Sequence, residues 1–327
     1  MKTITYHEMG DPADVLRIED VEASALTSGE ARVSVLASPI HPSNLLQISG
    51  HYGTKPNLPA VPGSEGVGRV IEVADDVTGL KVGQTVLLAG YNTWCQELTG
   101  PAASFIPVPD GADIQQLSMI VVNPMTALRL LDSFADLKEG DWVIQSAANS
   151  AVGEYLIQLA KQRGIRTINI VRRESAAEGL LALGADHVVV DGTDLTEQIK
   201  SVSGGDPLAL AFDAVGGDTF TKMVSALSYG GTIVCYGLLS MEMPTLPSTA
   251  VIFNDVSVKG FWLSQWFKIA SAEEKQKTFA EIIGLVASGA LQTKVSQTFS
   301  LDEIHEAVKV AAAGGRDGKV LLLPNPL

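Results

Sequence analysis

Along the first third of the chain, short apolar runs alternate with turns rich in glycine and proline. The runs ARVSVLAS, EGVGRVIEV and QTVLLAG have the length and composition of β-strands. The turns between them recur at the spacing of an all-β barrel. This pattern predicts a β-rich domain over residues 1–118.

From about Met119 the apolar period changes. An apolar helix from Pro124 to Phe134 is followed by strands and helices in alternation. The predicted strands are DWVIQSA, TINIVRR, HVVV, LALAFDAV, GTIVCYG and VSVKGFW. Strands joined by crossover helices form a parallel sheet, so residues 119–266 are predicted to form a six-strand, doubly wound α/β domain.

The last part of the chain carries a different set of elements. After Trp266 come a charged helix, a strand near VSQTFS, a capped helix opening at Ser300 to Asp302, and a last strand, KVLLLP. Since 327 residues exceed the size of a single core, two domains are expected. We expect residues 267–327 to return to the first of them.

Composition narrows the possible partners and location. The net charge of −14 argues against nucleic acid or an anionic membrane as a partner, because both attract a basic surface. The two cysteines, Cys95 and Cys235, cannot form a disulfide framework. The start of the chain, MKTITYHEMGDP, has no apolar run of signal-peptide length. These features predict a soluble protein in the reducing cytoplasm.

The strongest local signal is the segment VIQSAANSAVG. An apolar strand runs into a turn of small residues and then a helix, so the first N–H groups of the helix face a ligand phosphate. Ala151 stands where a glycine is common, and only Gly153 keeps the close contact of helix with strand. The segment predicts a pyrophosphate site; an ordinary strand–turn–helix is the alternative.

The next strand ends in Arg172 and Arg173. An NAD-dependent enzyme carries an acidic residue there to hold the ribose 2′-hydroxyl, whereas a guanidinium pairs with a 2′-phosphate. The arginines therefore favour NADPH over NADH as the cofactor. The alternative is a solvated basic strand end.

Zinc has to be weighed because this architecture often carries it. A catalytic zinc needs about three side-chain ligands, and His41, Glu65 and Cys95 are the plausible ones. Ser64 precedes Glu65 where a zinc enzyme of this shape would place a histidine. We therefore expect no metal site, and expect His41 to pack or to support a neighbouring group.

Without a metal, a proton donor has to stabilise a developing enolate or alcohol. Tyr52, in the loop SGHYGTKPNLP, is the first candidate, because a tyrosine hydroxyl is protonated at neutral pH and can donate. The alternative is a tyrosine that covers apolar surface. The aromatic segment FWLSQW, residues 261–266, is a core or subunit-contact strand whose following loop could also line a cleft.

Together these segments resemble the mitochondrial-type trans-2-enoyl-thioester reductases of the zinc-independent medium-chain dehydrogenase/reductase superfamily. The resemblance covers nearly the whole chain. It is carried by HPSNLLQISGHYG, LPAVPGSEGVGRVIEV, VTGLKVGQTV, VVNPMTALRLL, VIQSAANSAVG, RTINIVRR, AVGG, YGGTIVCYG and KGFWLSQW. It implies an α/β fold with a GroES-like β-rich catalytic domain and a Rossmann cofactor domain. Asn44, Ala151 and Glu174 depart from the family pattern.

The resemblance also implies roles for individual residues. Tyr52 would be the proton donor, and the asparagine of the N-P-x-T-A motif, Asn123, would touch the nicotinamide. The remaining cofactor contacts would be Asn149, Ser150, Ala151, Val152, Gly153, Arg172, Arg173, Tyr236, Gly237, Leu238, Leu239, Phe261, Trp262, Leu263 and Lys319. A homodimer joined through the edge strand VSVKGFW is implied as well.

The function expected from the resemblance is NADPH-dependent reduction of the C2=C3 double bond of a 2-enoyl thioester, within fatty acid metabolism. Hydride would reach the β-carbon, and Tyr52 would protonate the α-carbon. Two alternatives stay open. One is a quinone or enone oxidoreductase on the same fold, and the other is a protein that binds NADPH without turnover.

Overall fold

The chain forms two units, each with its own core, in a computed structural model that describes residues 1–90, 92–315 and 317–327. Unit 1 comprises Met1–Val122 with Phe279–Leu327, and unit 2 comprises Asn123–Thr278. These divisions fall slightly later in the chain than the expected ones. The first lies at the start of a helix and the second lies within one.

Unit 1 is built on an antiparallel-rich sheet. The strand order is β14-β15-β3-β4-β5-β7, with β6 paired to β3, and β1 pairs with β2 separately. Its strands are β1 (Lys2–Thr5), β2 (Arg17–Asp20), β3 (Glu30–Pro39), β4 (Val67–Val73), β5 (Thr85–Leu87), β6 (Glu97–Pro101), β7 (Ile106–Pro107), β14 (Val295–Phe299) and β15 (Lys319–Leu322).

Unit 1 also contains helices that the strand pattern did not predict. They are α1 (Pro12–Val15), α2 (Pro42–Ile48) and α3 (Ile114–Leu117), in addition to the expected α12 (Ile304–Ala312). The short turns η1 (Ala102–Ser104) and η3 (Leu301–Glu303) complete the set. Proline at the first helical position starts both α1 and α2, because its fixed φ suits that position and its missing N–H is not needed there.

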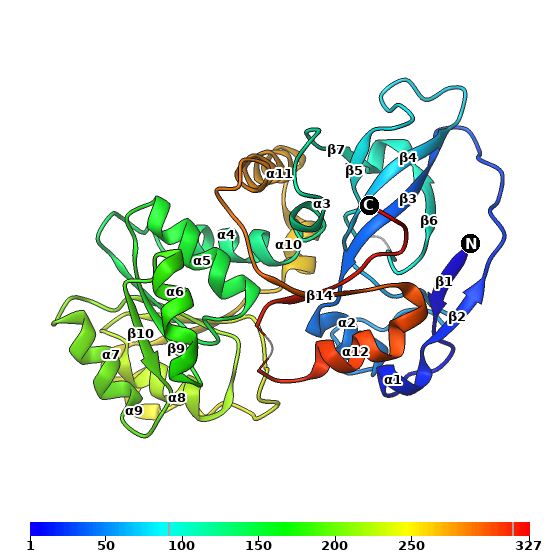
Figure 1. Cartoon of the computed structure of the whole chain (residues 1–327). Helices are drawn as coiled ribbons and strands as arrows, with labels where there is room; N and C mark the ends of the chain where they lie inside the picture. The colour runs from blue at the N-terminus through cyan, green and yellow to red at the C-terminus, as the bar shows by residue number, and fades with distance from the viewer. Residues whose placement is uncertain (91, 316) are drawn as a thin grey trace. The chain divides into compact units, whose positions relative to one another are not determined.

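The C-terminal segment contributes to the core of unit 1. Ile304 and Val308 of α12 belong to one buried cluster with Ile4, Tyr6 and Ile48. Figure 1 shows the orange-red α12 beside the blue α1 and α2, which it contacts. Segments from opposite ends of the sequence therefore share one core.

Unit 2 is a six-strand parallel sheet with helices on both faces. Its strand order is β10-β9-β8-β11-β12-β13, and every pairing is parallel. The strands are β8 (Trp142–Gln145), β9 (Arg166–Val171), β10 (His187–Val190), β11 (Leu210–Asp213), β12 (Thr232–Cys235) and β13 (Ser257–Gly260). The predicted α/β fold class and the doubly wound sheet are confirmed.

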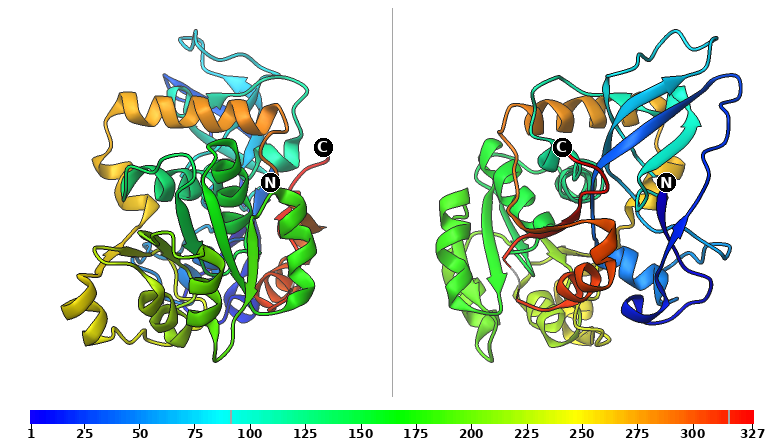
Figure 2. Two further views of the ribbon diagram at one scale, coloured as in Figure 1. Left: turned by 90° about the vertical axis from the view of Figure 1, so that its left-hand side faces the viewer. Right: turned by 45° about the vertical axis from the view of Figure 1, so that its right-hand side comes forward.

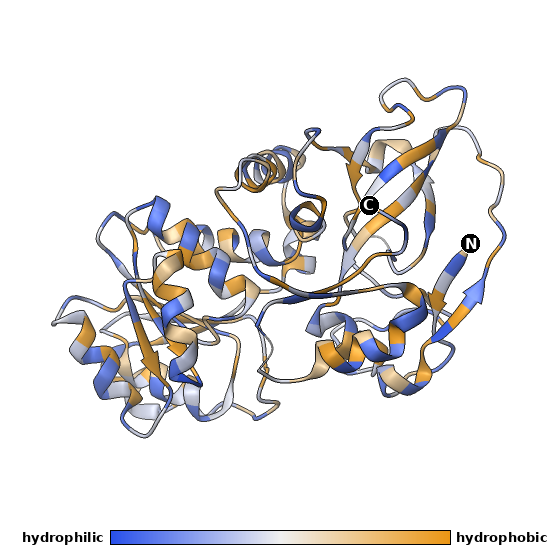
Figure 3. Cartoon of the chain, viewed as in Figure 1, coloured by the Kyte–Doolittle hydropathy of each residue, from blue (hydrophilic) through white to orange (hydrophobic). Residues whose placement is uncertain are grey.

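The helices that surround this sheet are α4 (Asn123–Ser133), α5 (Ala151–Gln162), α6 (Ala177–Leu183), α7 (Leu195–Ser203), α8 (Gly217–Ala226), α9 (Ser248–Asn254) and α10 (Leu263–Ile269), with the turn η2 (Glu174–Ala176). The next helix, α11 (Ala272–Ala287), contains the boundary at which unit 1 resumes. Figure 2 shows from two further directions the green and yellow-green strands of this unit with helices on either side. In Figure 3 the helices alternate between polar and apolar positions, as expected for helices that bury one face.

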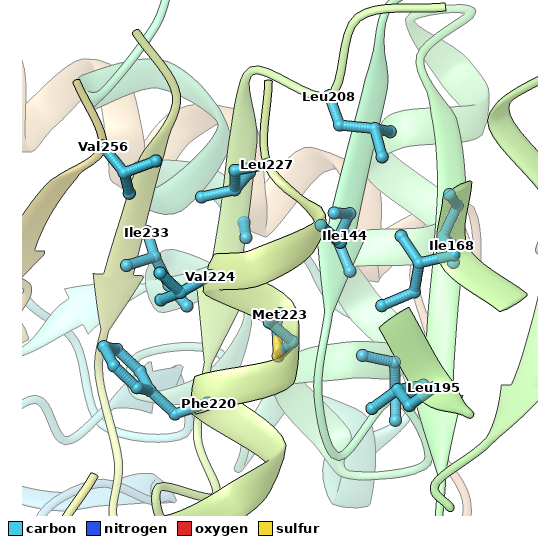
Figure 4. Packing of buried hydrophobic residues seen from close by; sticks show 14 of the residues in the cluster. Ile144, Ile168, Leu195, Leu208, Phe220, Met223, Val224, Leu227, Ile233 and Val256 are labelled. Atoms are coloured by element: carbon cyan, nitrogen blue, oxygen red, sulfur yellow. The ribbon is translucent and has the colours of Figure 1, made fainter. Parts of the chain in front are cut away.

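One face of the sheet carries the larger core of unit 2. Figure 4 shows Ile144 and Ile168 from the strands packed with Leu195 of α7 and with Phe220 and Met223 of α8. Each such fully buried side chain contributes about 1.5–3 kcal/mol. The other face buries a separate cluster under α5 and α6. A sheet covered on both faces explains why its strands consist of nearly continuous apolar residues.

None of the helices within the described ranges is long and apolar enough to cross a membrane.

Candidate functional site

The turn between β8 and α5 fits a phosphate group. Ser150 caps the helix, and its hydroxyl accepts a hydrogen bond from the Gly153 N–H at 3.2 Å. The N–H groups of Ala151 and Val152 make no hydrogen bond with any residue that the structure describes. These N–H groups and the positive end of the helix dipole suit an anion.

The backbone explains how this turn works with few glycines. A Cβ at Gly153 would lie 2.3 Å from the carbonyl oxygen of Ala148, so this position has to be glycine. Ala151 is already the first residue of α5 and needs no special conformation. The left-handed position falls instead on Ala147, with φ of 49°. A side chain there costs on the order of 1 kcal/mol, which the surrounding turn has to offset.

A buried carboxylate ties this turn to the next one along the edge of the sheet. Asp213, at the end of β11, accepts a hydrogen bond from the Ser146 hydroxyl at 2.6 Å. Its two oxygens also accept from the N–H groups of Val215 and Gly216. The Ser146 oxygen in turn accepts from the Ala214 N–H at 2.9 Å. Both turns at the carboxyl edge are therefore held in fixed positions.

Two amides inside the sheet support the same turn from below. The Gln145 amide nitrogen donates to the carbonyl of Gly153 at 3.1 Å and to Asn169 Oδ1 at 2.7 Å. Asn169 donates in turn to Thr167 Oγ1 and to the His187 carbonyl. A polar residue in the middle of a buried strand is the sequence signal that could have identified this network, and the sequence analysis missed it.

Arg172 and Arg173 lie at the carboxyl end of β9, and both are exposed. Neither forms an ion pair within the described parts of the chain, whereas Arg166 on the same strand pairs with Asp206. Two unpaired guanidinium groups after the second strand of such a sheet fit a 2′-phosphate.

Two further predicted segments follow strands of the same sheet. Residues 236–239 come directly after β12, and residues 261–263 come after β13. Because the strands are parallel, both segments lie at the same edge as the phosphate turn. Burial of the Tyr236 hydroxyl and the nearby Asp213 carboxylate raise the pKa of Tyr236 well above its ordinary value, so it remains a hydrogen-bond donor at neutral pH.

The segment FWLSQW is not a strand, contrary to the prediction. The strand β13 ends at Gly260, and Leu263 begins the helix α10. The apolar residues Leu263, Trp266 and Phe267 are spaced three and four positions apart, which is the spacing of one helical face. The aromatic content hid this period in the sequence.

Asn123 is the first residue of α4 and is 7% exposed. Its amide nitrogen is buried and has no hydrogen-bond partner among the residues that the structure describes. A buried donor without a partner costs about 1–3 kcal/mol, so the position is suited to a ligand acceptor. This orphaned donor, the unbonded N–H groups of the phosphate turn and the two unpaired arginines fit NADPH.

Tyr52 belongs to unit 1. It is half-buried in the irregular segment between α2 and β4, as the sequence predicted for its loop. Lys319, also assigned to the cofactor by resemblance, is the first residue of β15 in the same unit and is 5% exposed.

The ammonium group of Lys319 takes part in a buried network. Its Nζ donates to the carbonyl of Ile40 at 3.2 Å and lies 3.0 Å from His41 Nδ1. His41 Nε2 lies 2.6 Å from Glu65 Oε1. Both ring nitrogens of His41 are thus engaged with protein side chains.

Zinc does not fit these residues. The three candidate ligands were His41, Glu65 and Cys95, but His41 has no ring nitrogen left for a metal. Burial and the charge of Glu97 raise the pKa of the Cys95 thiol to about 12, which disfavours the thiolate that zinc binds. In the described part of the chain, no three His, Cys, Asp or Glu side chains are grouped to hold a metal.

Comparison with known proteins agrees with this architecture. Residues 27–110 match the family model described as alcohol dehydrogenase GroES-like domain, and residues 151–288 match the one described as zinc-binding dehydrogenase. A GroES-like unit and a Rossmann unit with no fitting zinc site define a zinc-independent medium-chain dehydrogenase/reductase.

Individual relatives narrow the class. The mitochondrial enoyl-[acyl-carrier-protein] reductase of Homo sapiens is 36% identical over 95% of this chain and 85% of its own length. The enzyme of the same name from Xenopus tropicalis is 37% identical over 94% and 90%. The chain belongs to the enoyl thioester reductase family of the medium-chain superfamily, as the sequence motifs predicted.

Two solved structures are similar to this chain, one of an enoyl thioester reductase and the other of a quinone reductase. The complex of Etr1p with NADP and crotonyl-CoA has a TM-score of 0.88 and 29% identity, covering 98% of this chain and 99% of that one. An NADPH:quinone reductase structure from Bacillus thuringiensis has a TM-score of 0.92 and 31% identity, covering 99% of both chains.

The predicted cytoplasmic location is wrong by this comparison. The enoyl reductases from human, rat, frog and Arabidopsis all carry the word mitochondrial in their names, which points to mitochondria rather than the cytoplasm. The prediction depended on cysteine count and the N-terminal segment, and neither feature distinguishes these two reducing compartments.

Proposed function

We propose that this chain is an NADPH-dependent reductase of 2-enoyl thioesters. The observation that carries the proposal is the similarity to enoyl-[acyl-carrier-protein] reductases over 95% of the chain. A phosphate turn and two unpaired arginines at the same sheet edge support it. Bound NADPH supplies the hydride that adds to C3 of the thioester, while a proton adds to C2 and the C2=C3 double bond becomes single.

Unit 2 provides all the proposed cofactor contacts except that of Lys319. The turn of residues 149–153 holds the pyrophosphate through the unbonded N–H groups of Ala151 and Val152, and Arg172 and Arg173 hold the 2′-phosphate. Asn123 donates its amide to the nicotinamide end, and residues 236–239 and 261–263 line the remaining length. Holding both reactants in one geometry makes the reaction effectively unimolecular, which is where most of the rate enhancement arises.

Tyr52 is the proposed proton donor to C2, directly or through a water that it orients. Its supports are its place in a loop of unit 1, its half-buried side chain and the match of SGHYG to the family. Lys319 remains a proposed cofactor residue, although its ammonium group is hydrogen-bonded to Ile40 and His41.

A second candidate function is quinone or enone reduction with the same cofactor. The observation in its favour is the TM-score of 0.92 with an NADPH:quinone reductase. A protein that binds NADPH without turnover is a third candidate.

The test is NADPH oxidation with crotonyl-CoA, trans-2-decenoyl-CoA and a benzoquinone at equal concentrations. Faster turnover of the thioesters is the expected result. Turnover of the quinone with inert thioesters would replace the proposal by the second candidate. Tight NADPH binding in a fluorescence titration, with no oxidation of NADPH by any of the three compounds, would favour the third candidate function.

We also propose that two copies of the chain pair through the edge strand β13. All four residues of β13 are exposed, and Phe253 of the adjacent α9 is 71% exposed. A strand edge with open backbone groups beside exposed apolar side chains favours a symmetric partner. Sedimentation should find a dimer that Val258→Glu dissociates and Val82→Glu, an exposed position in unit 1, does not. A monomeric wild-type protein would contradict this.

A further inference from the structure

Lys319, His41 and Glu65 form a continuous hydrogen-bonded chain inside unit 1. The three residues are 5%, 1% and 0% exposed, respectively. With Lys319 in its ammonium form, which only donates, His41 Nδ1 accepts from Lys319 at 3.0 Å. The ring proton is therefore on Nε2, which donates to Glu65 Oε1 at 2.6 Å. The direction of every hydrogen bond in this chain is fixed by the charged lysine.

The second carboxylate oxygen of Glu65 ends this hydrogen-bonded series at backbone N–H groups. Oε2 accepts from the N–H of Val121 at 2.5 Å and from the N–H of Val122 at 3.1 Å. The next residue is Asn123, the first of the eleven residues of α4. A carboxylate at this place also interacts favourably with the positive end of the helix.

The cost of the arrangement indicates that it does more than cap a helix. Burying opposite charges carries a large desolvation cost that their hydrogen bonds have to offset, and a neutral serine or asparagine caps a helix without that cost. Here the charges hold the backbone directly before a buried amide nitrogen that has no partner within the described residues.

We infer that Lys319, His41 and Glu65 are positioning residues for the reaction: they fix the backbone of residues 121–122 and so orient the Asn123 amide for the nicotinamide end of NADPH. The inference rests on the proposed function for the role of Asn123. In this inference the three residues act by positioning the backbone and take no part in proton transfer.

The sharpest variant is Glu65→Gln, because it changes charge and hydrogen-bond direction with almost no change in shape. Its carbonyl oxygen can still accept from the backbone N–H groups. Its NH₂ then faces His41 Nε2, which has to accept, so the ring proton moves to Nδ1 and points at the Lys319 ammonium. Arg32→Met is the matched control, since Arg32 is a buried cation of the same unit, 7% exposed, in a network with Glu72 and Ser24.

Two ligands distinguish a loss of positioning at the nicotinamide end from a general loss of structure. NADPH spans the whole site, whereas 2′,5′-ADP lacks the nicotinamide half and reports only on the adenosine and phosphate end. In Glu65→Gln we expect NADPH to bind about 3- to 10-fold more weakly, the loss of about one hydrogen bond, with 2′,5′-ADP unchanged. Single-turnover hydride transfer should fall roughly 10- to 100-fold because the reacting geometry is disturbed. Arg32→Met should leave all three quantities unchanged.

Equal weakening of both ligands would overturn the inference, and so would NADPH binding and hydride transfer within twofold of wild type. If Glu65→Gln does not fold, His41→Asn serves in its place with the same expectations, because the shorter amide cannot reach both Glu65 and Lys319. The wild-type turnover of crotonyl-CoA tests the proposed function separately. If only a quinone is reduced, the proposed function fails, while the comparison of NADPH with 2′,5′-ADP still decides the inference.

Discussion

The two units hold their buried polar groups in different ways. Unit 1 buries full charges, with Glu65 and Lys319 joined through His41. Unit 2 buries the carboxylate of Asp213, whose hydrogen-bond partners are a hydroxyl and backbone N–H groups rather than a buried cation. It supports the turn between β8 and α5 with neutral amides, Gln145 and Asn169, and leaves Arg172 and Arg173 at the end of β9 exposed.

This difference follows from what each unit has to hold. In the proposed function unit 2 binds the phosphate groups of the cofactor, which bring their own charge, so unbonded N–H groups and cations that are not already paired suit it. Unit 1 holds its own backbone at residues 121–122, and a carboxylate accepts two N–H groups at once. Charged networks should therefore be more sensitive to single substitutions than neutral ones, and the following predictions test that.

The largest expected effect is on the stability of unit 1. Glu65→Leu leaves the Lys319 charge without its carboxylate and two buried N–H groups without an acceptor, so the free energy of unfolding should fall by about 3–5 kcal/mol. Gln145→Leu breaks the neutral network and should cost only about 1–3 kcal/mol. Urea unfolding of both variants measures the difference. Equal losses of unfolding free energy in the two variants would contradict the proposed difference between the units.

The next effect is on turnover. Tyr52→Phe removes only a hydroxyl, and if that hydroxyl is the proton donor the turnover number should fall about 10²-fold with NADPH affinity unchanged. Steady-state kinetics with crotonyl-CoA and a fluorescence titration measure the two quantities. Tyr229→Phe, at a tyrosine that is 78% exposed, is the control. Unchanged turnover would remove Tyr52 from the mechanism.

The exposed cations of unit 2 should give a smaller effect that depends on the cofactor. Arg172→Ala should weaken NADPH binding about tenfold and leave NADH binding unchanged, because only NADPH carries the 2′-phosphate. Arg163→Ala, which loses an ion pair with Asp132 in the same unit, is the control. An equal loss of affinity for NADPH and NADH would show that Arg172 does not recognise the 2′-phosphate.

The smallest effect concerns the one cysteine in each unit. Burial raises the thiol pKa from 9.0 to about 12 for Cys95 and from 9.0 to about 11 for Cys235. The folded state keeps the two thiol protons to higher pH than the unfolded state does. The contribution of these thiols to the free energy of unfolding is therefore complete well below pH 9 and is lost as the pH rises through the pKa values of the folded state. At pH 9 the loss is roughly 0.4 kcal/mol per thiol.

Urea unfolding at pH 7 and pH 9 measures this loss. The paired substitutions Cys95→Ala and Cys235→Ala should reduce the difference in unfolding free energy between the two pH values. A difference unchanged by removing both thiols would show that other groups cause it.

Much of the fold was predictable because each element leaves a local trace. The six strands of unit 2 appeared as short apolar runs between helical periods, and the turn at residues 146–153 appeared as small residues between a strand and a helix. The helices α1, α2, α3 and α10 are among those that the sequence analysis missed. A seven-residue helix such as α2 gives too few turns for its period to stand out among strands, and the aromatic residues of α10 imitate a strand.

The sequence by itself determined the α/β class, the family, and where the candidate phosphate turn and the two adjacent arginines lie along the chain, because these depend on residue types at short, fixed spacing. Only the tertiary structure decided how His41, Glu65 and Lys319 are used. Residues 41, 65 and 319 come from three separate parts of the chain, and the direction of their hydrogen bonds depends on which group faces which. Two of the three residues that suggested zinc ligands in the sequence, His41 and Glu65, are hydrogen-bonded to each other in the folded chain, and His41 joins them to Lys319.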